Sequence, residues 1–353
     1  MVPVGGTIGI LGGGQLGRML ASAAAKLGLD VIVYCPDENT PAARAAARHW
    51  PGAFDDTAAL TAFAEACDAV TLEWENVPVL AAETVALAGK PMRPGPSALS
   101  VAQDRAEEKA FLERSGIPVT PWRTVDTVRD LRAALADFGG RGILKTRREG
   151  YDGKGQVRLG EESDAAAALD ALGGQPSILE AFAPFEREIS AIVARSPTGE
   201  TAHYAIPENT HRGGILRRST VPANIAPAVA QQARQAAETL AGALDYVGVL
   251  ALEFFAMADG ELLANEFAPR VHNSGHWTPE ACLTGQFENH IRAVAGWPLG
   301  RPDLVAPAVT MDNIIGALPA PGEFGLDVSL TLYGKREVRP GRKMGHTVRL
   351  AID

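Results

Sequence analysis

The sequence predicts a multidomain α/β and α+β protein. Its first part should be a doubly wound parallel sheet, its middle a mixed region, and its end a small β-rich part. Strand-like and helix-like segments alternate over the first hundred residues, which is the pattern of a parallel sheet. The 353-residue chain also exceeds what one core usually holds. We expect domains at 1–103, 104–300 and 301–353.

The N-terminal part combines a strand, a glycine-rich turn, a helix and two further strands, expected at residues 7–11, 12–17, 17–27, 31–34 and 69–72. A Gly-x-Gly-x-x-Gly turn between a strand and a helix is a dinucleotide-binding fingerprint, and Asp37 lies near the end of the second strand. Many phosphate and carboxylate sites use the same turn, so it does not identify the ligand. Gln15 can place its amide on whatever binds there.

The middle part should begin with a helix over about 98–114, ended by Gly116 and Pro118. Five further elements follow, which are strands at 142–146, 156–159, 177–182 and 188–194 and an amphipathic helix at 227–244. After Pro298 the chain turns to short strands and turns.

Two glutamates flank a predicted hairpin in this middle part. Asp259-Gly260 lies between apolar runs at 249–258 and 261–267 and predicts a two-residue type I′ turn. In that register Glu253 faces Glu266, with Cβ atoms about 5 Å apart. Like charges at that distance repel, and a divalent cation between them would remove the conflict. Oxygen ligands favour Mg²⁺ over zinc. The alternative is two exposed glutamates on a solvated face, and one extra loop residue would break the register.

A glycine-rich loop at 150–155 is a candidate phosphate cradle, because no Walker-type P-loop occurs in the sequence. Its glycines free backbone N–H groups for phosphate, and Lys154 supplies charge. Lys145 lies mid-strand and is costly to bury unless it pairs with an anion. Glu180 ends a strand, where an acid can accept hydrogen bonds from ribose hydroxyls. A plain hairpin with surface lysines is the alternative.

A dense polar run follows the hairpin, and it contains Arg270, His272, Asn273, Ser274 and His276. Such residues within seven positions are typical of a loop that binds or catalyses. A satisfied structural network is the alternative.

The composition excludes some classes of binding partner and favours others. A net charge of −9 argues against nucleic acid or an anionic membrane. Basic clusters at 141–158 and 335–349 suit small anions such as phosphates, with solvated surface charge as the alternative. Three widely spaced cysteines imply neither disulfides nor zinc. Without a recognisable signal peptide or an apolar run of about 20 residues, we expect a soluble, cytoplasmic protein.

Taken in order, these features resemble the ATP-grasp superfamily. Four stretches are similar to the N5-carboxyaminoimidazole ribonucleotide synthetase family, namely 12–19, 73–78, 150–156 and 269–276, and the C-terminal stretches 333–335 and 340–346 add to the likeness. It covers nearly the whole chain. Two positions depart from the family pattern: Val271 stands where proline is usual, and Asp312 where an apolar residue is common.

The resemblance implies an ATP-grasp fold and an ATP-dependent carboxylation of 5-aminoimidazole ribonucleotide by bicarbonate, in purine biosynthesis. It also implies Mg²⁺, or Mn²⁺, at Glu253 and Glu266, and a homodimer. The implied ATP contacts are Arg105, Lys145, Gly150, Tyr151, Asp152, Gly153, Lys154, Gly155, Gln156, Glu180, Ala181, Phe182, Ala183, Glu188, His211, Asn265 and Glu266. The implied ribonucleotide contacts are Gln15, Glu73, Tyr151, Asp152, Lys154, Arg270, His272, Asn273, Ser274, Lys335 and Arg342.

Three of these residues would take part in the chemistry. Lys145 would stabilise charge on the transferred phosphoryl group, Arg270 would hold carboxyphosphate or a developing oxyanion, and His272 would take the amine proton. Three other interpretations stay open: a different ATP-grasp ligase, such as the formate-dependent glycinamide ribonucleotide transformylase or a biotin carboxylase; an NAD-dependent oxidoreductase; and a non-catalytic nucleotide-binding regulator. The oxidoreductase leaves the facing glutamates and the 265–276 run unexplained.

Overall fold

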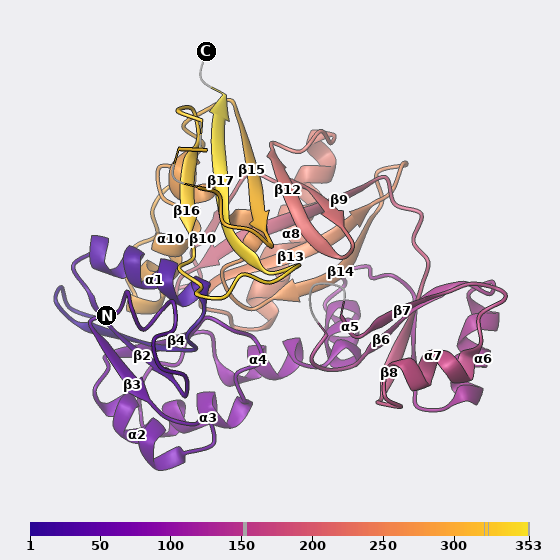
Figure 1. Cartoon of the computed structure of the whole chain (residues 1–353), viewed down its shortest axis with the longest axis horizontal. Helices are drawn as coiled ribbons and strands as arrows, with labels where there is room; N and C mark the ends of the chain where they lie inside the picture. Colours follow the sequence, from indigo (N-terminus) through magenta and orange to yellow (C-terminus); the bar gives the residue numbers. More distant parts are fainter. Residues whose placement is uncertain (151–153, 321, 324, 352–353) are drawn as a thin grey trace.

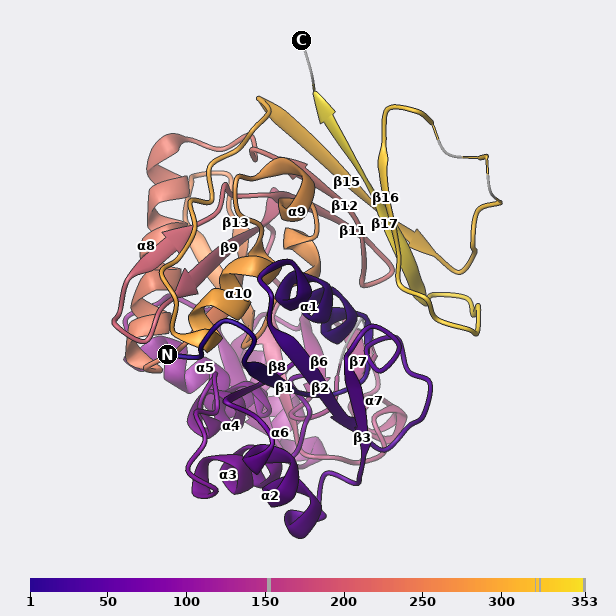
Figure 2. The same cartoon turned by 90° about the vertical axis from the view of Figure 1, so that its left-hand side faces the viewer.

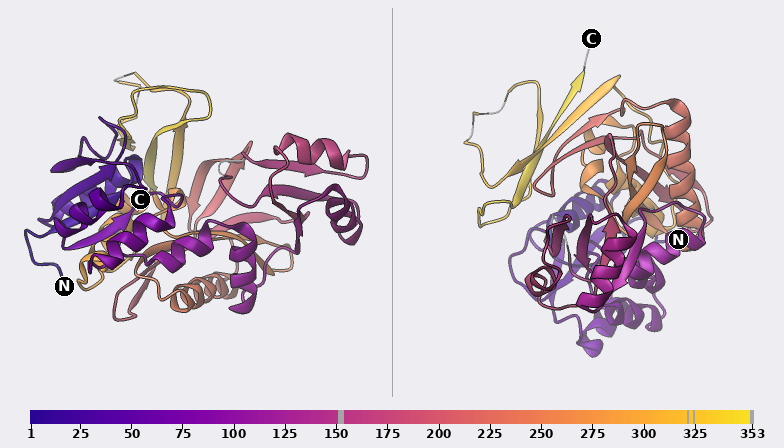
Figure 3. Two further views of the ribbon diagram at one scale, coloured as in Figure 1. Left: turned by 90° about the horizontal axis from the view of Figure 1, so that it is seen from below. Right: turned by 90° about the vertical axis from the view of Figure 1, so that its right-hand side faces the viewer.

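The computed structural model describes residues 1–150, 154–320, 322–323 and 325–351. They form three sheets, of four, nine and four strands. Figures 1 and 3 show the N-terminal part (indigo) at one end and a small lobe (magenta) at the other, with the large sheet between them. Within the described ranges, no helix is both long and apolar enough to cross a membrane.

The N-terminal sheet is parallel, with strand order β3-β2-β1-β4, as predicted for a doubly wound fold. Its elements are β1 (Thr7–Leu11), α1 (Gln15–Lys26), β2 (Asp30–Cys35), β3 (Arg48–Pro51), α2 (Thr57–Glu65), β4 (Ala69–Leu72) and α3 (Val79–Leu87). The three predicted strands are confirmed. β3 was not predicted, because this edge strand has the sequence Arg-His-Trp-Pro, which lacks an apolar run and ends in proline.

The single helix predicted over 98–114 is wrong. The structure has α4 (Pro96–Ala102) and α5 (Arg105–Arg114) instead. Asp104 separates them, because it adopts an extended conformation and its Oδ1 accepts the Ala106 N–H at 3.0 Å. Such an acidic N-cap begins a helix, and the apolar pattern alone concealed it.

The small lobe is an antiparallel sheet with strand order β5-β8-β6-β7, and two helices pack on it. Its elements are β5 (Trp122–Val125), α6 (Val128–Asp137), β6 (Gly142–Thr146), β7 (Gln156–Leu159), α7 (Ala165–Ala171) and β8 (Ser177–Ala181). Leu131, Leu144, Leu169 and Leu179 are buried in its core. This lobe brings the predicted strand lysine and strand-end glutamate onto neighbouring strands.

The large sheet has the order β14-β13-β9-β11-β12-β15-β17-β16, and β10 pairs with β9. Its strands are β9 (Arg187–Arg195), β10 (Thr201–His203), β11 (Glu208–Arg212), β12 (Ile215–Val221), β13 (Gly248–Ala256), β14 (Leu262–Ala268), β15 (Ala308–Ile315), β16 (Ser329–Leu332) and β17 (Lys343–Ala351). Successive strand residues face opposite sides. Val249 and Ala251 pack with α10 (Gln286–Ala295), whereas Leu250 and Leu252 pack with α8 (Pro227–Ala243). The two helices therefore cover opposite faces.

The C-terminal part is β-rich, as predicted, but it forms no sheet of its own. β15 pairs antiparallel with β12, so β15, β17 and β16 continue the large sheet, and Figure 2 shows them beside β11 and β12. Asp312 lies opposite Arg218 in this pairing and forms an ion pair with it at 2.7 Å, which accounts for the acid at that position. The predicted boundaries at 103/104 and 300/301 stay predictions.

The predicted pairing of Glu253 with Glu266 is confirmed, but the predicted two-residue turn is wrong. Three residues, 258–260, form the loop, because the Met257 N–H donates to the carbonyl of Glu261 and Gly260 adopts a φ of +89°. That extra residue shifts the register by one. A β-bulge at Asn265 shifts it back, because this residue has no partner between Phe254 and Glu253.

Candidate active site

Lys145 joins the small lobe to the large sheet. Its Nζ lies 2.8 Å from Glu180 Oε2 on β8 and 3.3 Å from Asn265 Oδ1 on β14. Lys145 is 7% exposed, so the expectation that it needs an anionic partner is confirmed. Lys109, on α5, lies 3.2 Å from the other oxygen of Glu180.

Glu180 is 2% exposed between these two ammonium groups. Burial opposes its ionisation, yet Lys109 and Lys145 hold its pKa at about 2. Two cations around one buried carboxylate leave an excess of positive charge, which suits a phosphate chain. Lys109 was not predicted as a site residue, although it follows Arg105 by four positions and therefore lies on the same helix face.

Arg105 links the hairpin to the glycine-rich loop. Its guanidinium lies 2.7 Å from Glu266 Oε2 and donates to the Gly150 carbonyl at 3.0 Å. The loop closes where the Thr146 N–H donates to the carbonyl of Gly155, which has a φ of +70°. The predicted contacts Tyr151, Asp152 and Gly153 lie outside the described residues. Lys154 and Gln156 follow them, at the end of the loop and the start of β7.

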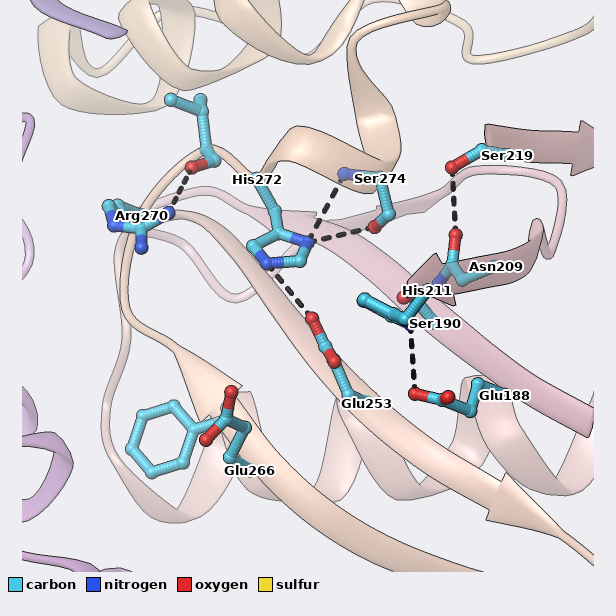
Figure 4. Close-up of polar contacts among 12 residues, drawn as sticks. Glu188, Ser190, Asn209, His211, Ser219, Glu253, Glu266, Arg270, His272 and Ser274 are labelled. Carbon is cyan, nitrogen blue, oxygen red and sulfur yellow. Dashed lines mark hydrogen bonds and ion pairs between the residues drawn. The ribbon is translucent and has the colours of Figure 1, made fainter. Parts of the chain in front are cut away.

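Glu253 and Glu266 lie on adjacent strands, as Figure 4 shows. Glu253 Oε1 lies 3.0 Å from His272 Nε2, and Nδ1 of that ring lies 2.8 Å from the Ser274 hydroxyl. Glu266 pairs with Arg105. Each carboxylate therefore has a basic side chain beside it, so the repulsion expected between them does not by itself require a divalent cation.

The two carboxylates nevertheless fit Mg²⁺. They offer hard oxygen ligands on facing residues, and the Asn265 amide oxygen lies next in the chain. Within the described part of the chain, no group of three or more His, Cys, Asp or Glu side chains gathers as a possible metal site. Two carboxylates completed by substrate phosphates and water are a usual protein site for this ion.

Two further predicted ATP contacts, Glu188 and His211, lie on the neighbouring strands β9 and β11. Glu188 Oε2 is 3.0 Å from His211 Nδ1 (Figure 4). Burial lowers the pKa of His211, but the hydrogen bond and charge of Glu188, together with the charge of Glu253, outweigh it, and the net shift is upward. Near the end of β8, the Arg158 guanidinium lies 4.5 Å from the Phe182 ring centre. Ala181 and Ala183 flank this ring in the chain connecting the lobes.

The glycine-rich turn of the N-terminal part holds a carboxylate of the chain itself. Glu73 accepts the N–H groups of Gly14 at 2.8 Å and Gly17 at 3.3 Å. A Cβ added at Gly14 would lie 2.7 Å from Glu73 Oε2. Burial raises the pKa of Glu73, and these two N–H groups counteract part of the rise. A dinucleotide pyrophosphate would need the donors that Glu73 takes, so the NAD interpretation has no support here.

Arg270 pairs with Glu75, a partner that the sequence analysis missed. Its Nη2 donates to Glu75 Oε1 at 2.6 Å, and its Nε contacts the other oxygen, which is a two-point pairing. Burial opposes ionisation of Glu75, but Arg270 lowers its pKa below the ordinary value. The signal was present, since Glu73 and Glu75 belong to one of the stretches that carry the resemblance.

Asn273, Gln15, Lys335 and Arg342 are further predicted contacts of the ribonucleotide. Both polar atoms of the Asn273 side chain are buried without a hydrogen-bond partner among the described residues, so this amide suits a ligand. Gln15 is the first residue of α1. On the 333–343 segment, Lys335 Nζ donates to the Lys343 carbonyl at 2.9 Å, and Arg342 donates to the Glu337 carbonyl.

Comparison with known proteins agrees with this geometry. Models of a ribonucleotide synthetase preATP-grasp domain, an ATP-grasp domain and a phosphoribosylaminoimidazole carboxylase C-terminal domain match residues 6–103, 110–287 and 310–353. The chain is 54% identical over 352 residues to an N5-carboxyaminoimidazole ribonucleotide synthase of Brucella melitensis, covering 98% of this chain and 96% of the relative. The chain belongs to the N5-carboxyaminoimidazole ribonucleotide synthetase family.

Solved structures of N5-carboxyaminoimidazole ribonucleotide synthetases are also similar to this chain. An ADP complex aligns with a TM-score of 0.94 at 41% identity, covering 100% of this chain and 94% of the other. The enzyme of Aspergillus clavatus with ADP and 5-aminoimidazole ribonucleotide aligns with a TM-score of 0.91 at 33% identity, covering 99% and 94%. These findings confirm the predicted ATP-grasp fold. In this member of the family, Val271 is fully buried, so the valine there is a core residue.

Proposed function

We propose that this protein carboxylates 5-aminoimidazole ribonucleotide with bicarbonate and ATP, forming N5-carboxyaminoimidazole ribonucleotide, ADP and phosphate in purine biosynthesis. The main support for this proposal lies where the small lobe meets the large sheet. There Lys145 contacts Glu180 and Asn265, beside the facing residues Glu253 and Glu266. The names and bound ligands of the relatives support the same reaction.

ATP would lie between the small lobe and the large sheet. Lys109, Lys145 and Arg105 supply positive charge for its phosphates, and the N–H groups of the glycine-rich loop add donors. The connecting segment 180–183 would meet the adenine, and Glu188 with His211 would meet the ribose. Lys145 and Arg105 already hold partners in the structure, so the triphosphate would share these cations with Glu180 and Glu266.

Glu253 and Glu266 would hold Mg²⁺, or Mn²⁺, with Asn265 beside them. When bound, the ion would neutralise charge on the phosphates and hold them in line. His272 contacts Glu253 through Nε2, and the Ser274 hydroxyl beside its Nδ1 fixes the direction of its ring.

A bicarbonate oxygen would attack the γ-phosphorus and displace ADP, giving carboxyphosphate. The amine of the ribonucleotide would then attack the carboxyl carbon, phosphate would leave, and His272 would take the amine proton. Arg270, oriented by Glu75, would hold the carboxyphosphate. Carboxyphosphate hydrolyses in water, so the site would need to exclude solvent from it.

The ribonucleotide would lie between the N-terminal and C-terminal parts. Gln15, Glu73, Lys154, Asn273 and Ser274 would contact its ring and sugar, while the predicted contacts Tyr151 and Asp152 lie outside the described residues. Lys335 and Arg342 would bind its 5′-phosphate. We further propose a homodimer that works in the cytoplasm.

The deciding experiment measures phosphate release from ATP with and without 5-aminoimidazole ribonucleotide and bicarbonate. We expect release that depends on both, with the carboxylated product seen by ¹³C-bicarbonate NMR. Release that instead requires formate and glycinamide ribonucleotide would replace this proposal with the transformylase. ATP binding with no stimulated release would favour a regulator.

A further inference from the structure

β14 ends the large sheet, so one side of its backbone faces no strand of that sheet, and on that side Ala264 forms an isolated β-bridge with Val119. On that side Ala264 and Phe267 both direct backbone polar groups toward α5. In a regular strand, residues two positions apart direct their backbone N–H and C=O groups to the same side, but Ala264 and Phe267 are three positions apart. The additional residue at Asn265 accounts for the difference.

Side chains of α5 take up these two backbone groups. Lys109 Nζ donates to the Ala264 carbonyl at 3.3 Å, and Glu108 Oε1 accepts the Phe267 N–H at 2.6 Å. Arg105, on the same helix face, holds the Glu266 side chain. The helix therefore contacts the strand before, within and after the segment that carries Asn265 and Glu266.

Glu108 is 2% exposed, and Leu112, one turn further along the same helix, is buried in an apolar cluster that includes Ala264 and Phe267. An apolar side chain there would bury more favourably but would leave the Phe267 N–H without an acceptor. A carboxyl side chain at this place is therefore better explained by the bulge than by packing of the core.

We propose that Glu108 is a positioning residue for the metal and nucleotide site. By accepting the Phe267 N–H, it fixes the bulge that returns Glu266 to its place opposite Glu253 and directs Asn265 toward Lys145. Without that bond, β14 loses the contact next to Glu266, and the two carboxylates no longer present their oxygens to one ion. This inference rests on the proposed function, since it takes Glu266 as a metal ligand.

The test compares Glu108→Met, which keeps the length but removes the acceptor, with Glu108→Gln, which keeps an acceptor. Glu107→Met, on the exposed face of the same helix, is the matched control. Calorimetry gives the affinity for ADP with Mg²⁺ and with EDTA, and hydrogen exchange reports residues 263–268. Mg²⁺ should raise the affinity for ADP roughly tenfold less in Glu108→Met than in the parent, because an unsatisfied buried N–H is costly. Its affinity in EDTA should stay within about threefold of the parent, and exchange at Phe267 should be faster.

Glu108→Gln and Glu107→Met should behave like the parent. A full Mg²⁺ gain in Glu108→Met, or equal losses with Mg²⁺ and with EDTA, would overturn the positioning role. Should Glu108→Met fail to fold, Glu108→Asp shortens the reach and should lose part of the gain, and a parent-like Glu108→Asp would overturn the role equally. A parent protein without any Mg²⁺ gain would refute the metal site itself, and the parent alone shows this.

Discussion

Replacing Glu180 with glutamine should loosen the small lobe. Glu180 lies between Lys109 and Lys145, and its pKa is held at about 2 instead of 4.5. At about 1.4 kcal/mol for each pH unit, the folded state favours its ionised form by about 3 kcal/mol. Removing one member of a buried ion pair costs a similar amount, about 3–5 kcal/mol, because its partners stay buried and charged.

Hydrogen exchange of the β6 and β8 amides measures this loss where it occurs. A loss of about 3 kcal/mol corresponds to roughly 100-fold faster exchange in Glu180→Gln at neutral pH. Glu162→Gln, an exposed glutamate of the same lobe, is the control and should not change exchange.

The pH dependence has a definite sign. Because the folded-state pKa of Glu180 is depressed, its stabilisation is complete above the ordinary value of 4.5 and is lost as the pH falls from there toward 2. The difference between variant and parent should therefore be constant from pH 7 to pH 5. A change in exchange below about tenfold, or a difference that narrows between pH 7 and pH 5, would refute the reasoning.

Three further outcomes are expected. Glu266→Ala should lower stimulated phosphate release at least about 100-fold while the circular dichroism spectrum is kept, and turnover within a few fold of the parent would defeat the metal assignment. Chelation by EDTA should stop release, and Mg²⁺ or Mn²⁺ should restore it; release that continues in EDTA would contradict a metal-dependent reaction. Gly14→Ala should destabilise the protein by about 1–3 kcal/mol in urea unfolding, because its Cβ would lie 2.7 Å from Glu73 Oε2. Gly95→Ala, where a Cβ meets nothing within 4 Å, is its control, and equal effects of the two would contradict the contact.

The hairpin illustrates how far the sequence could predict the site. Apolar strands around Asp259-Gly260 correctly indicated the reversal and the pairing of Glu253 with Glu266. The bulge at Asn265 could not be predicted, because side chains of α5 and not local residues contact β14 on either side of it. The errors in the loop length and in the bulge cancelled, and the pairing survived them.

The ion pairs mark the other limit. Lys145 in a buried strand predicted an anionic partner, but nothing local identified Glu180. The Arg270–Glu75 pair joins residues 195 positions apart, so only the packing of the N-terminal part against the large sheet brings them together. The strand-end acid, the strand lysine and the polar run were recognisable because each occupies one short stretch of chain.

The continuous pairing of β12 with β15 has a consequence for any shortened version of this protein. A chain cut before β15 would leave the edge of β12 unpaired, and its exposed N–H and C=O groups could then pair with a strand of another molecule. Such a fragment should self-associate through this edge. Besides any part in binding substrate, the C-terminal strands therefore cover the edge of β12 and should prevent it from pairing with another molecule.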